Sequence, residues 1–306
     1  MSSSIAVILH HYDMSPFSEK IRKILAFKNA PWHAVTQSMW LPRPHLTPMT
    51  GAYRRIPVLQ TGADVWCDTR LIARRIDELF PDPPLVPVGR EAAADAIAQW
   101  ADRHMFQAAV PQVFTALGAM LPPELMADRK KMRPDLDPSV LAAMVPDLKN
   151  ELRVWIQGLD RTLARGGFLL GDTFSGADAS AYHVLWFARN APDVGAMLGQ
   201  FPGVQRWLAA IDAMGQGRRE EMTPEAALAI AKDAEPATAR RADPHDPNGL
   251  APGARVAISS DDLPQNRFDG EVVALDVDEI VILRHDPACG AIALHCPRAG
   301  YRITPA

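Results

Sequence analysis

Two hydroxyl-bearing side chains, Tyr12 and Ser15, lie where the start of a helix could give them a chemical role. They follow a short apolar run, Ile5 to Leu9, that predicts a strand. Ser15 stands at an N-cap position and Pro16 at a first helical position, so we expect a helix from Ser15 to Lys28. The free amide groups and the positive dipole end of such a helix favour a thiolate or another anion. Ser15 therefore either only caps the helix or also donates a hydrogen bond to a bound anion.

The segments around this helix predict a mixed α/β domain over residues 1–82. An extended run at 56–60, a strand at Val65–Cys67 and a helix from Asp68 to Leu79 follow the first helix. The sequence PDPPLVP at 81–87 then interrupts regular structure, because proline lacks an amide proton and restricts φ. We interpret this stretch as the boundary to a second domain.

The rest of the chain predicts a helical domain at 88–233, a linker at 234–250 and a small β-barrel domain of unassigned role at 251–306. In the helical part, apolar residues recur at helical spacing, and Ser175 with Asp178 resembles a capping box. The linker is rich in Pro, Ala, Asp and Arg and has no periodicity. Five short β-rich runs separated by turn signals follow the linker, which favours a small antiparallel barrel.

The composition limits the class of protein. The 306 residues are 48% hydrophobic and 22% charged, which argues against global disorder. A net charge of -4 does not predict nucleic-acid binding. No apolar run reaches the roughly 20 residues that span a bilayer, and the N-terminal segment lacks the features of a signal peptide. We expect a cytoplasmic protein that binds neither nucleic acid nor membrane.

The three cysteines, Cys67, Cys289 and Cys296, form neither a disulfide framework nor a metal-ligand pattern. Cys289 and Cys296 could meet across a hairpin, but a reducing compartment favours free thiols. His10 and His11 are adjacent and would face opposite sides of a strand, which opposes a shared metal. We therefore expect no metal cofactor.

Three separated segments resemble the thioredoxin-like N-terminal domain of cytosolic glutathione transferases: SPFSEKIRKIL at 15–25, RRIPVLQ at 54–60 and CDTRLIARRIDELFP at 67–81. The segment FLLGDTFSGADAS is similar to the helical C-terminal domain of that family. The resemblance covers about residues 5–222. It implies the glutathione transferase fold, a thioredoxin-like α/β domain followed by an all-α helical domain. The C-terminal barrel departs from the family pattern.

The resemblance implies a glutathione site made by Arg55, Ile56, Pro57, Asp68 and Thr69. Pro57 matches the cis proline of the family, and the backbone of Ile56 would pair with the cysteinyl part of glutathione. The helix start at Thr69 would bind the γ-glutamyl carboxylate, while Asp68 would pair with the ammonium group. Arg55 would contact the peptide backbone or the glycine carboxylate. Asp68 also fits a plain N-cap, Arg55 a solvated side chain and Pro57 a trans proline on an edge strand.

Within the resemblance, Ser15 matches the catalytic serine of some classes. The sequence SPFS resembles a CPxC redox motif in which oxygen replaces both sulfurs, which excludes dithiol exchange at Ser15 and Ser18. Ser15 would instead donate a hydrogen bond to the glutathione thiolate and lower the pKa of the thiol. Tyr12 is a competing donor, because another branch of the family uses a tyrosine, and His11 is a further candidate.

Trp40, Met105 and Phe106 could line an apolar pocket for a second substrate, or could belong to the core. The predicted activity is that of a glutathione transferase, which takes glutathione as co-substrate and adds its thiolate to a small apolar electrophile, as in detoxification. The family is usually a two-fold dimer, so we expect a homodimer. The alternative is a non-catalytic glutathione-binding or scaffold protein that recruits a partner through the barrel. A Cys-dependent peroxidase or reductase lacks its cysteine at position 15, although Cys67 lies next to the proposed site.

Overall fold

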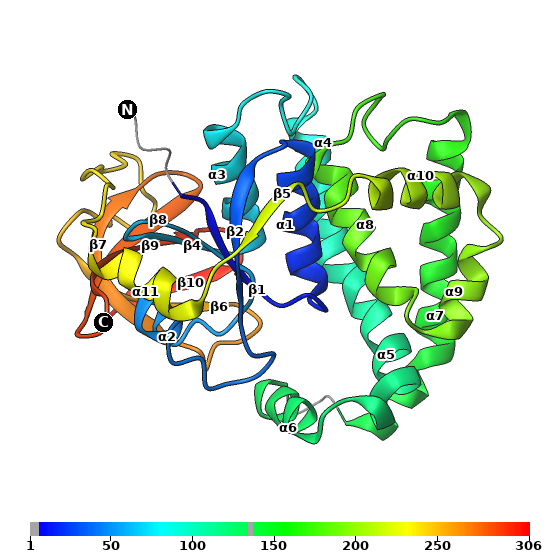
Figure 1. Cartoon of the computed structure of the whole chain (residues 1–306), viewed down its shortest axis with the longest axis horizontal. Helices are drawn as coiled ribbons and strands as arrows, with labels where there is room; N and C mark the ends of the chain where they lie inside the picture. The colour runs from blue at the N-terminus through cyan, green and yellow to red at the C-terminus, as the bar shows by residue number, and fades with distance from the viewer. Residues whose placement is uncertain (1–5, 134–136) are drawn as a thin grey trace. The chain divides into compact units, whose positions relative to one another are not determined.

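A mixed sheet of ten strands is the centre of the first of two structural units (Figure 1). The computed structural model describes residues 6–133 and 137–306. The first unit runs to Ser18 and also takes in residues 31–75 and 218–306, so both ends of the chain contribute to one sheet. The second unit comprises residues 19–30 and 76–217 and is helical.

The strand order of the sheet is β10-β6-β7-β8-β9-β4-β3-β1-β2-β5. The strands are β1 (Ile8–His11), β2 (Pro31–Thr36), β3 (Val58–Thr61), β4 (Asp64–Cys67), β5 (Arg218–Glu221), β6 (Arg255–Ser260), β7 (Phe268–Leu275), β8 (Glu279–Asp286), β9 (Gly290–Pro297) and β10 (Tyr301–Pro305). The first unit also holds α2 (Thr47–Thr50) and α11 (Pro224–Lys232), and α3 (Thr69–Leu79) crosses its boundary after Arg75. Strand β2 and the four-residue elements α2 and β5 were not predicted from the sequence.

Strand β1 begins and ends later than the apolar run predicts, and Ile5 lies outside the described residues. It pairs in parallel with β2 and antiparallel with β3, and these partners extend the strand through His10 and His11. Nε2 of His10 hydrogen-bonds Oε1 of Gln60 on β3 at 2.8 Å. Burial lowers the pKa of His10 to about 4, so the imidazole stays neutral at physiological pH inside the sheet. Strand partners, and not hydrophobicity alone, therefore set the bounds of β1.

The C-terminal strands β6 to β10 confirm the predicted all-β character of the tail, residues 251–306. Strands β6 to β9 form an antiparallel meander, and β10 returns to pair with β6. The expected barrel differs in one respect, because β9 pairs in parallel with β4 and so continues the N-terminal sheet. A single hydrophobic cluster then contains residues of both parts, among them Val65 on β4 and Leu294 on β9.

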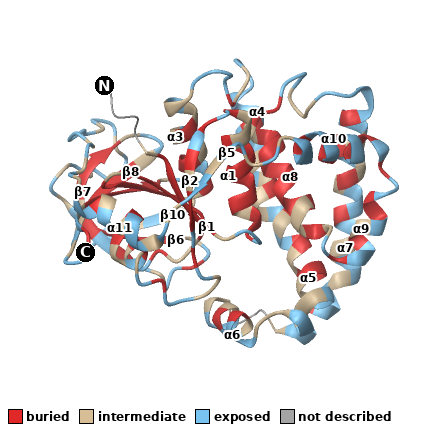
Figure 2. Cartoon of the chain, viewed as in Figure 1, coloured by how far each residue is buried: buried red, intermediate tan, exposed pale blue. Residues whose placement is uncertain are grey.

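The second unit contains the helical region that the sequence predicts. Its elements are most of α1 (Pro16–Phe27), then α4 (Glu91–Gln99), a π-helix (Trp100–Met105), α5 (Phe106–Leu117), a 3-10 turn (Gly118–Met120), α6 (Pro123–Met132), α7 (Pro138–Thr162), a second 3-10 turn (Leu163–Arg165), α8 (Gly176–Ala188), α9 (Pro192–Leu198) and α10 (Pro202–Ala213). Helix α8 is largely buried, as Figure 2 shows. The predicted capping box is present at its start, where the Asp178 carboxylate accepts from the N–H of Ser175 at 2.9 Å.

Candidate functional site

Ser15 lies directly before α1 and caps it, as predicted. Its Oγ accepts a hydrogen bond from the N–H of Ser18 at 3.1 Å, and its own N–H donates to the carbonyl of Tyr12 at 3.0 Å. The side chain is 2% exposed. Because the cap bond uses a lone pair of the oxygen, the hydroxyl proton is left for a second acceptor. The catalytic role of Ser15 stays a prediction.

The other candidates near the start of α1 differ in their surroundings. The ring of Tyr12 is partly buried against the hydrophobic cluster of the sheet. His11 is fully buried, with its ring edge-on to Trp32 at 5.6 Å between centroids. Ser18 is also fully buried, and its hydroxyl has no hydrogen-bond partner within residues 6–133 and 137–306. A buried hydroxyl of this kind is uncommon, so the first turn of α1 retains hydrogen-bonding capacity that the described protein groups do not use.

The segment from Arg55 to Pro57 and the start of α3 lie in the same unit as Ser15. The Ile56–Pro57 peptide bond is cis, and both residues are buried. Asp68 follows β4 with a φ of 73°, in the left-handed region that glycine, asparagine and aspartate adopt most readily. Its Oδ1 accepts from the N–H of Arg70 at 3.0 Å, so it caps α3 as the sequence predicts. Thr69, the first residue of α3, is buried.

Two side chains from the C-terminal part of the chain, one in the loop after β6 and one in β10, contact residues that are expected to bind glutathione. Nη2 of Arg55 hydrogen-bonds both carboxylate oxygens of Asp262. The hydroxyl of Tyr301 donates to Oδ2 of Asp68 at 3.1 Å, and the N–H of Asp68 donates to the hydroxyl of Tyr53 at 3.0 Å. Burial raises the pKa of Tyr301 well above its ordinary value, so its hydroxyl stays protonated and remains a donor.

Asp262 and Tyr301 were not predicted from the sequence as site residues. Both belong to the tail, 207 and 233 positions along the chain from Arg55 and Asp68. A single exposed acid beside a turn and a tyrosine in an edge strand carry no local signal of a partner so far away. Only the pairing of β9 with β4 and of β10 with β6 brings them to the site.

Cys67 lies beside the proposed site but is chemically protected. All three cysteines are free and fully buried, which confirms the expectation of free thiols. Burial, together with a hydrogen bond to the thiol of Cys296, raises the pKa of Cys67 well above its ordinary value. Since the thiolate is the reactive form of cysteine, this environment opposes mixed-disulfide chemistry at Cys67.

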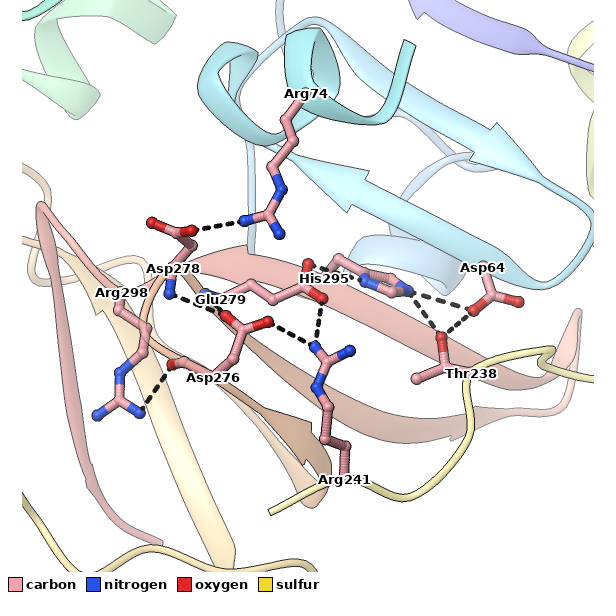
Figure 3. Close-up of polar contacts among 9 residues, drawn as sticks. All are labelled: Asp64, Arg74, Thr238, Arg241, Asp276, Asp278, Glu279, His295 and Arg298. Carbon is pink, nitrogen blue, oxygen red and sulfur yellow. Dashed lines mark hydrogen bonds and ion pairs between the residues drawn. The ribbon is translucent and has the colours of Figure 1, made fainter. Parts of the chain in front are cut away.

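A buried charge cluster lies where the tail joins β4 (Figure 3). His295 of β9 places Nε2 at 3.2 Å from Oδ1 of Asp64 and Nδ1 at 3.3 Å from Oε2 of Glu279. The imidazole stacks on Trp66 with 4.3 Å between ring centroids, and Arg241 contacts Glu279 at 3.1 Å. One imidazole between two carboxylates therefore links β4, β8 and β9.

The cluster predicts a pH-dependent contribution to stability. Burial opposes the charged imidazole, but the hydrogen bonds to Asp64 and Glu279 outweigh it and raise the pKa of His295 above 6.5. The contribution is complete below the unfolded pKa and is lost as the pH rises through the raised folded pKa. We expect His295→Gln to lower the free energy of unfolding by about 2 kcal/mol at about pH 6, and by less at about pH 8.5.

Urea titrations of wild type and His295→Gln across this pH range measure the effect. His245→Gln is the matched control, because His245 is exposed. A stability difference between wild type and His295→Gln that is the same at every pH would contradict the assignment of a charged imidazole.

The residues predicted to line a second-substrate pocket lie in different units. Trp40 is half-buried in a loop of the first unit, where its backbone N–H donates to Oγ of Ser38 at 3.3 Å. Met105 and Phe106 belong to the helical unit. Met105 is fully buried, and Phe106 packs against the ring of His183 at 6.1 Å between centroids. The contacts of Phe106 fit the core interpretation, and the pocket stays a prediction.

Within the described ranges 6–133 and 137–306, no group of three or more His, Cys, Asp or Glu side chains could hold a metal ion. In the same part of the chain, every helix is too short or too polar to cross a bilayer.

The comparisons with known proteins agree with this architecture. The glutathione S-transferase N-terminal domain family matches residues 9–84, and the glutathione S-transferase C-terminal domain family matches residues 140–210. The crystal structure of a GST-like protein from Pseudomonas syringae is 34% identical, with a TM-score of 0.83. That match covers 99% of this chain and 100% of the Pseudomonas chain, so it includes the C-terminal strands.

Two further relatives match over a smaller part of this chain. A glutathione S-transferase from Rhodospirillum rubrum F11 is 22% identical with a TM-score of 0.56, covering 69% of this chain and 90% of its own. FtsZ-localized protein A from Caulobacter vibrioides (strain NA1000 / CB15N) is 31% identical over 107 residues. This match spans 33% of the present chain and 46% of the Caulobacter protein, less than half of the relative's length. On the family matches and the full-length Pseudomonas relative, this chain belongs to the glutathione S-transferase family.

Proposed function

We propose that this protein binds glutathione, stabilises its thiolate with Ser15 and transfers it to a small apolar electrophile. The observation that carries the proposal is the buried Ser15 hydroxyl at the start of α1, whose proton the cap bond does not use. Membership of the glutathione S-transferase family supports glutathione as the thiol. A cytoplasmic homodimer with a role in detoxification is part of the same proposal.

In the proposed reaction, Ser15 donates its hydroxyl proton in a hydrogen bond to the glutathione sulfur. The N–H groups of the first turn of α1 add partial positive charge. Both effects lower the pKa of the thiol, so a larger fraction is thiolate at neutral pH. The thiol proton leaves to solvent, the sulfur bonds to the electrophilic carbon, and a leaving group departs with its electron pair. Tyr12 is the alternative donor.

The start of α3 and the cis Ile56–Pro57 segment would position the peptide. Backbone N–H groups and the hydroxyl at Thr69 would hold the γ-glutamyl carboxylate, and Asp68 would pair with the ammonium group. Arg55 would face the glycine end of the tripeptide, and the backbone of Ile56 would pair with the cysteinyl part.

A non-catalytic role is the second candidate. The observation that favours it is that Arg55 and Asp68 each already have a partner from the tail, in Asp262 and Tyr301. In that role the C-terminal strands would recruit a partner protein. The name of the Caulobacter relative, FtsZ-localized protein A, suggests a role other than conjugation for at least one similar protein.

We expect Asp68→Ala to weaken glutathione binding about tenfold, because the variant loses a charge-assisted contact to the ammonium group. Calorimetric titration of wild type and variant with glutathione measures the change. Asp137→Ala is the matched control, since Asp137 caps α7 through the same type of bond, 3.0 Å from the N–H of Ser139. An equal loss in both variants would assign the effect to helix capping alone.

The same titration of the wild type tests the proposed function as a whole. Binding at millimolar glutathione, with a thiol pKa below that of free glutathione by absorbance titration, is the expected result. Absence of binding at that concentration overturns the proposal, and binding with an unshifted thiol pKa favours the non-catalytic role.

A further inference from the structure

The turn between β6 and β7 carries an acid that is held against the proposed glutathione site. Asp262 stands two residues after Ser260, the last residue of β6. Ser260 pairs with Tyr301 in β10, and the N–H of Asp261 donates to the carbonyl of Gly300 at 3.0 Å. The paired strands therefore place Asp262 and Tyr301 together.

Asp262 forms an ion pair with the guanidinium group of Arg55, which would otherwise be available to an anionic ligand. One nitrogen of Arg55 hydrogen-bonds both oxygens of the carboxylate. Burial opposes the ionised acid, but the charge of Arg55 outweighs it and lowers the pKa of Asp262, so the acid is ionised at neutral pH. The side chain of Arg55 is 32% exposed and that of Asp262 is 49% exposed, so solvent and ligands reach the pair.

At the other end of the proposed site, the carboxylate of Asp68 keeps positions for a further hydrogen-bond donor. Oδ1 of Asp68 accepts from the N–H of Arg70 and Oδ2 accepts from the hydroxyl of Tyr301. A carboxylate has about four lone-pair positions, so these two donors leave room for an ammonium group. The tail thus neutralises the cation at Arg55 but leaves the anion at Asp68.

We propose that Asp262 is a specificity-determining residue that makes this site prefer γ-glutamyl thiols whose C-terminal carboxylate is masked, for example as an ester or amide. The inference rests on the proposed function, because it assigns the glycine end of glutathione to Arg55. A free carboxylate at this position must displace Asp262 or share one guanidinium with it, and two adjacent carboxylates repel each other. A neutral ester carries no such penalty, while its ammonium end still pairs with Asp68.

Calorimetric titration with glutathione and with its glycyl monoethyl ester tests the proposal. We expect the wild type to bind the ester about threefold to tenfold more tightly than glutathione, a modest ratio because the competing acid is half exposed. In Asp262→Asn the preference for the ester is lost, because glutathione binding tightens about tenfold while ester binding changes by less than about twofold. Circular dichroism and thermal unfolding confirm that the variant is folded.

Asp278→Asn is the matched control. It removes the same charge from the same tail, at a half-exposed acid that pairs with Arg74 at 2.7 Å (Figure 3). We expect its ratio of ester to glutathione affinity to equal that of the wild type. A shift of equal size in both variants would assign the effect to net charge and overturn the specific role of Asp262.

The binding results distinguish a failure of the specificity proposal from a failure of the proposed function. If the wild type binds glutathione and Asp262→Asn leaves the affinity ratio unchanged, the specificity proposal fails and the proposed function stands. If neither ligand binds wild type or Asp262→Asn at millimolar concentration, the proposed function fails and the inference fails with it.

Discussion

Ser15→Ala is expected to lower the rate constant for conjugation of glutathione to an activated aryl chloride about 100-fold. The variant removes a hydrogen-bond donor that is 2% exposed and aligned with the start of α1. A donor of this type contributes most where water is excluded, because the developing or existing negative charge has few other partners. The thiol pKa of bound glutathione should rise at the same time, which an absorbance titration of the thiolate detects.

A control variant separates this effect from the loss of a helix cap. Thr223→Ala removes the cap of α11, where Oγ1 of Thr223 accepts from the N–H of Ala226 at 3.2 Å, and should cost only about 1 kcal/mol of stability. Its conjugation rate should match that of the wild type. If Ser15→Ala lowers the thiol pKa as far as the wild type does, the donor is Tyr12 or the backbone of α1.

Asp178→Ala is expected to lower the free energy of unfolding by about 3–5 kcal/mol. The fully buried carboxylate accepts from the N–H of Leu169 at 2.8 Å, from the Nε1 proton of Trp207 at 2.9 Å and from both the N–H and the hydroxyl of Ser175. Alanine leaves these donors without their acceptor inside the protein, at about 1–3 kcal/mol for each buried group that water cannot reach.

Urea or thermal unfolding followed by circular dichroism measures the loss. Asp172→Ala is the control, because Asp172 lies in the loop that precedes α8 and is exposed, and its effect should stay within about 0.5 kcal/mol. Asp178→Asn should fall between the two, since the amide keeps one oxygen as acceptor. Equal stability of Asp178→Ala and Asp172→Ala would show that the network around α8 does not contribute as described.

The helix starts and the family membership could be predicted from the sequence, because each depends on residues that are close together in the chain. Ser15, Asp68 and the pair Ser175 with Asp178 each cap a helix through a bond to a group no more than three residues away. The bounds of β1 were less accessible, because its partners β2 and β3 extend it through two histidines that an apolar pattern does not include.

The role of the tail depends on contacts that a local pattern does not encode. Alternating apolar residues predict that a strand has a buried face, but they do not specify which sheet edge it pairs with. The sequence alone therefore predicted the five C-terminal strands, the capped helices and the residues expected to bind glutathione. The tertiary structure joined β9 to β4 and placed Asp262 on Arg55 and Tyr301 on Asp68, because these pairings join segments more than 200 positions apart.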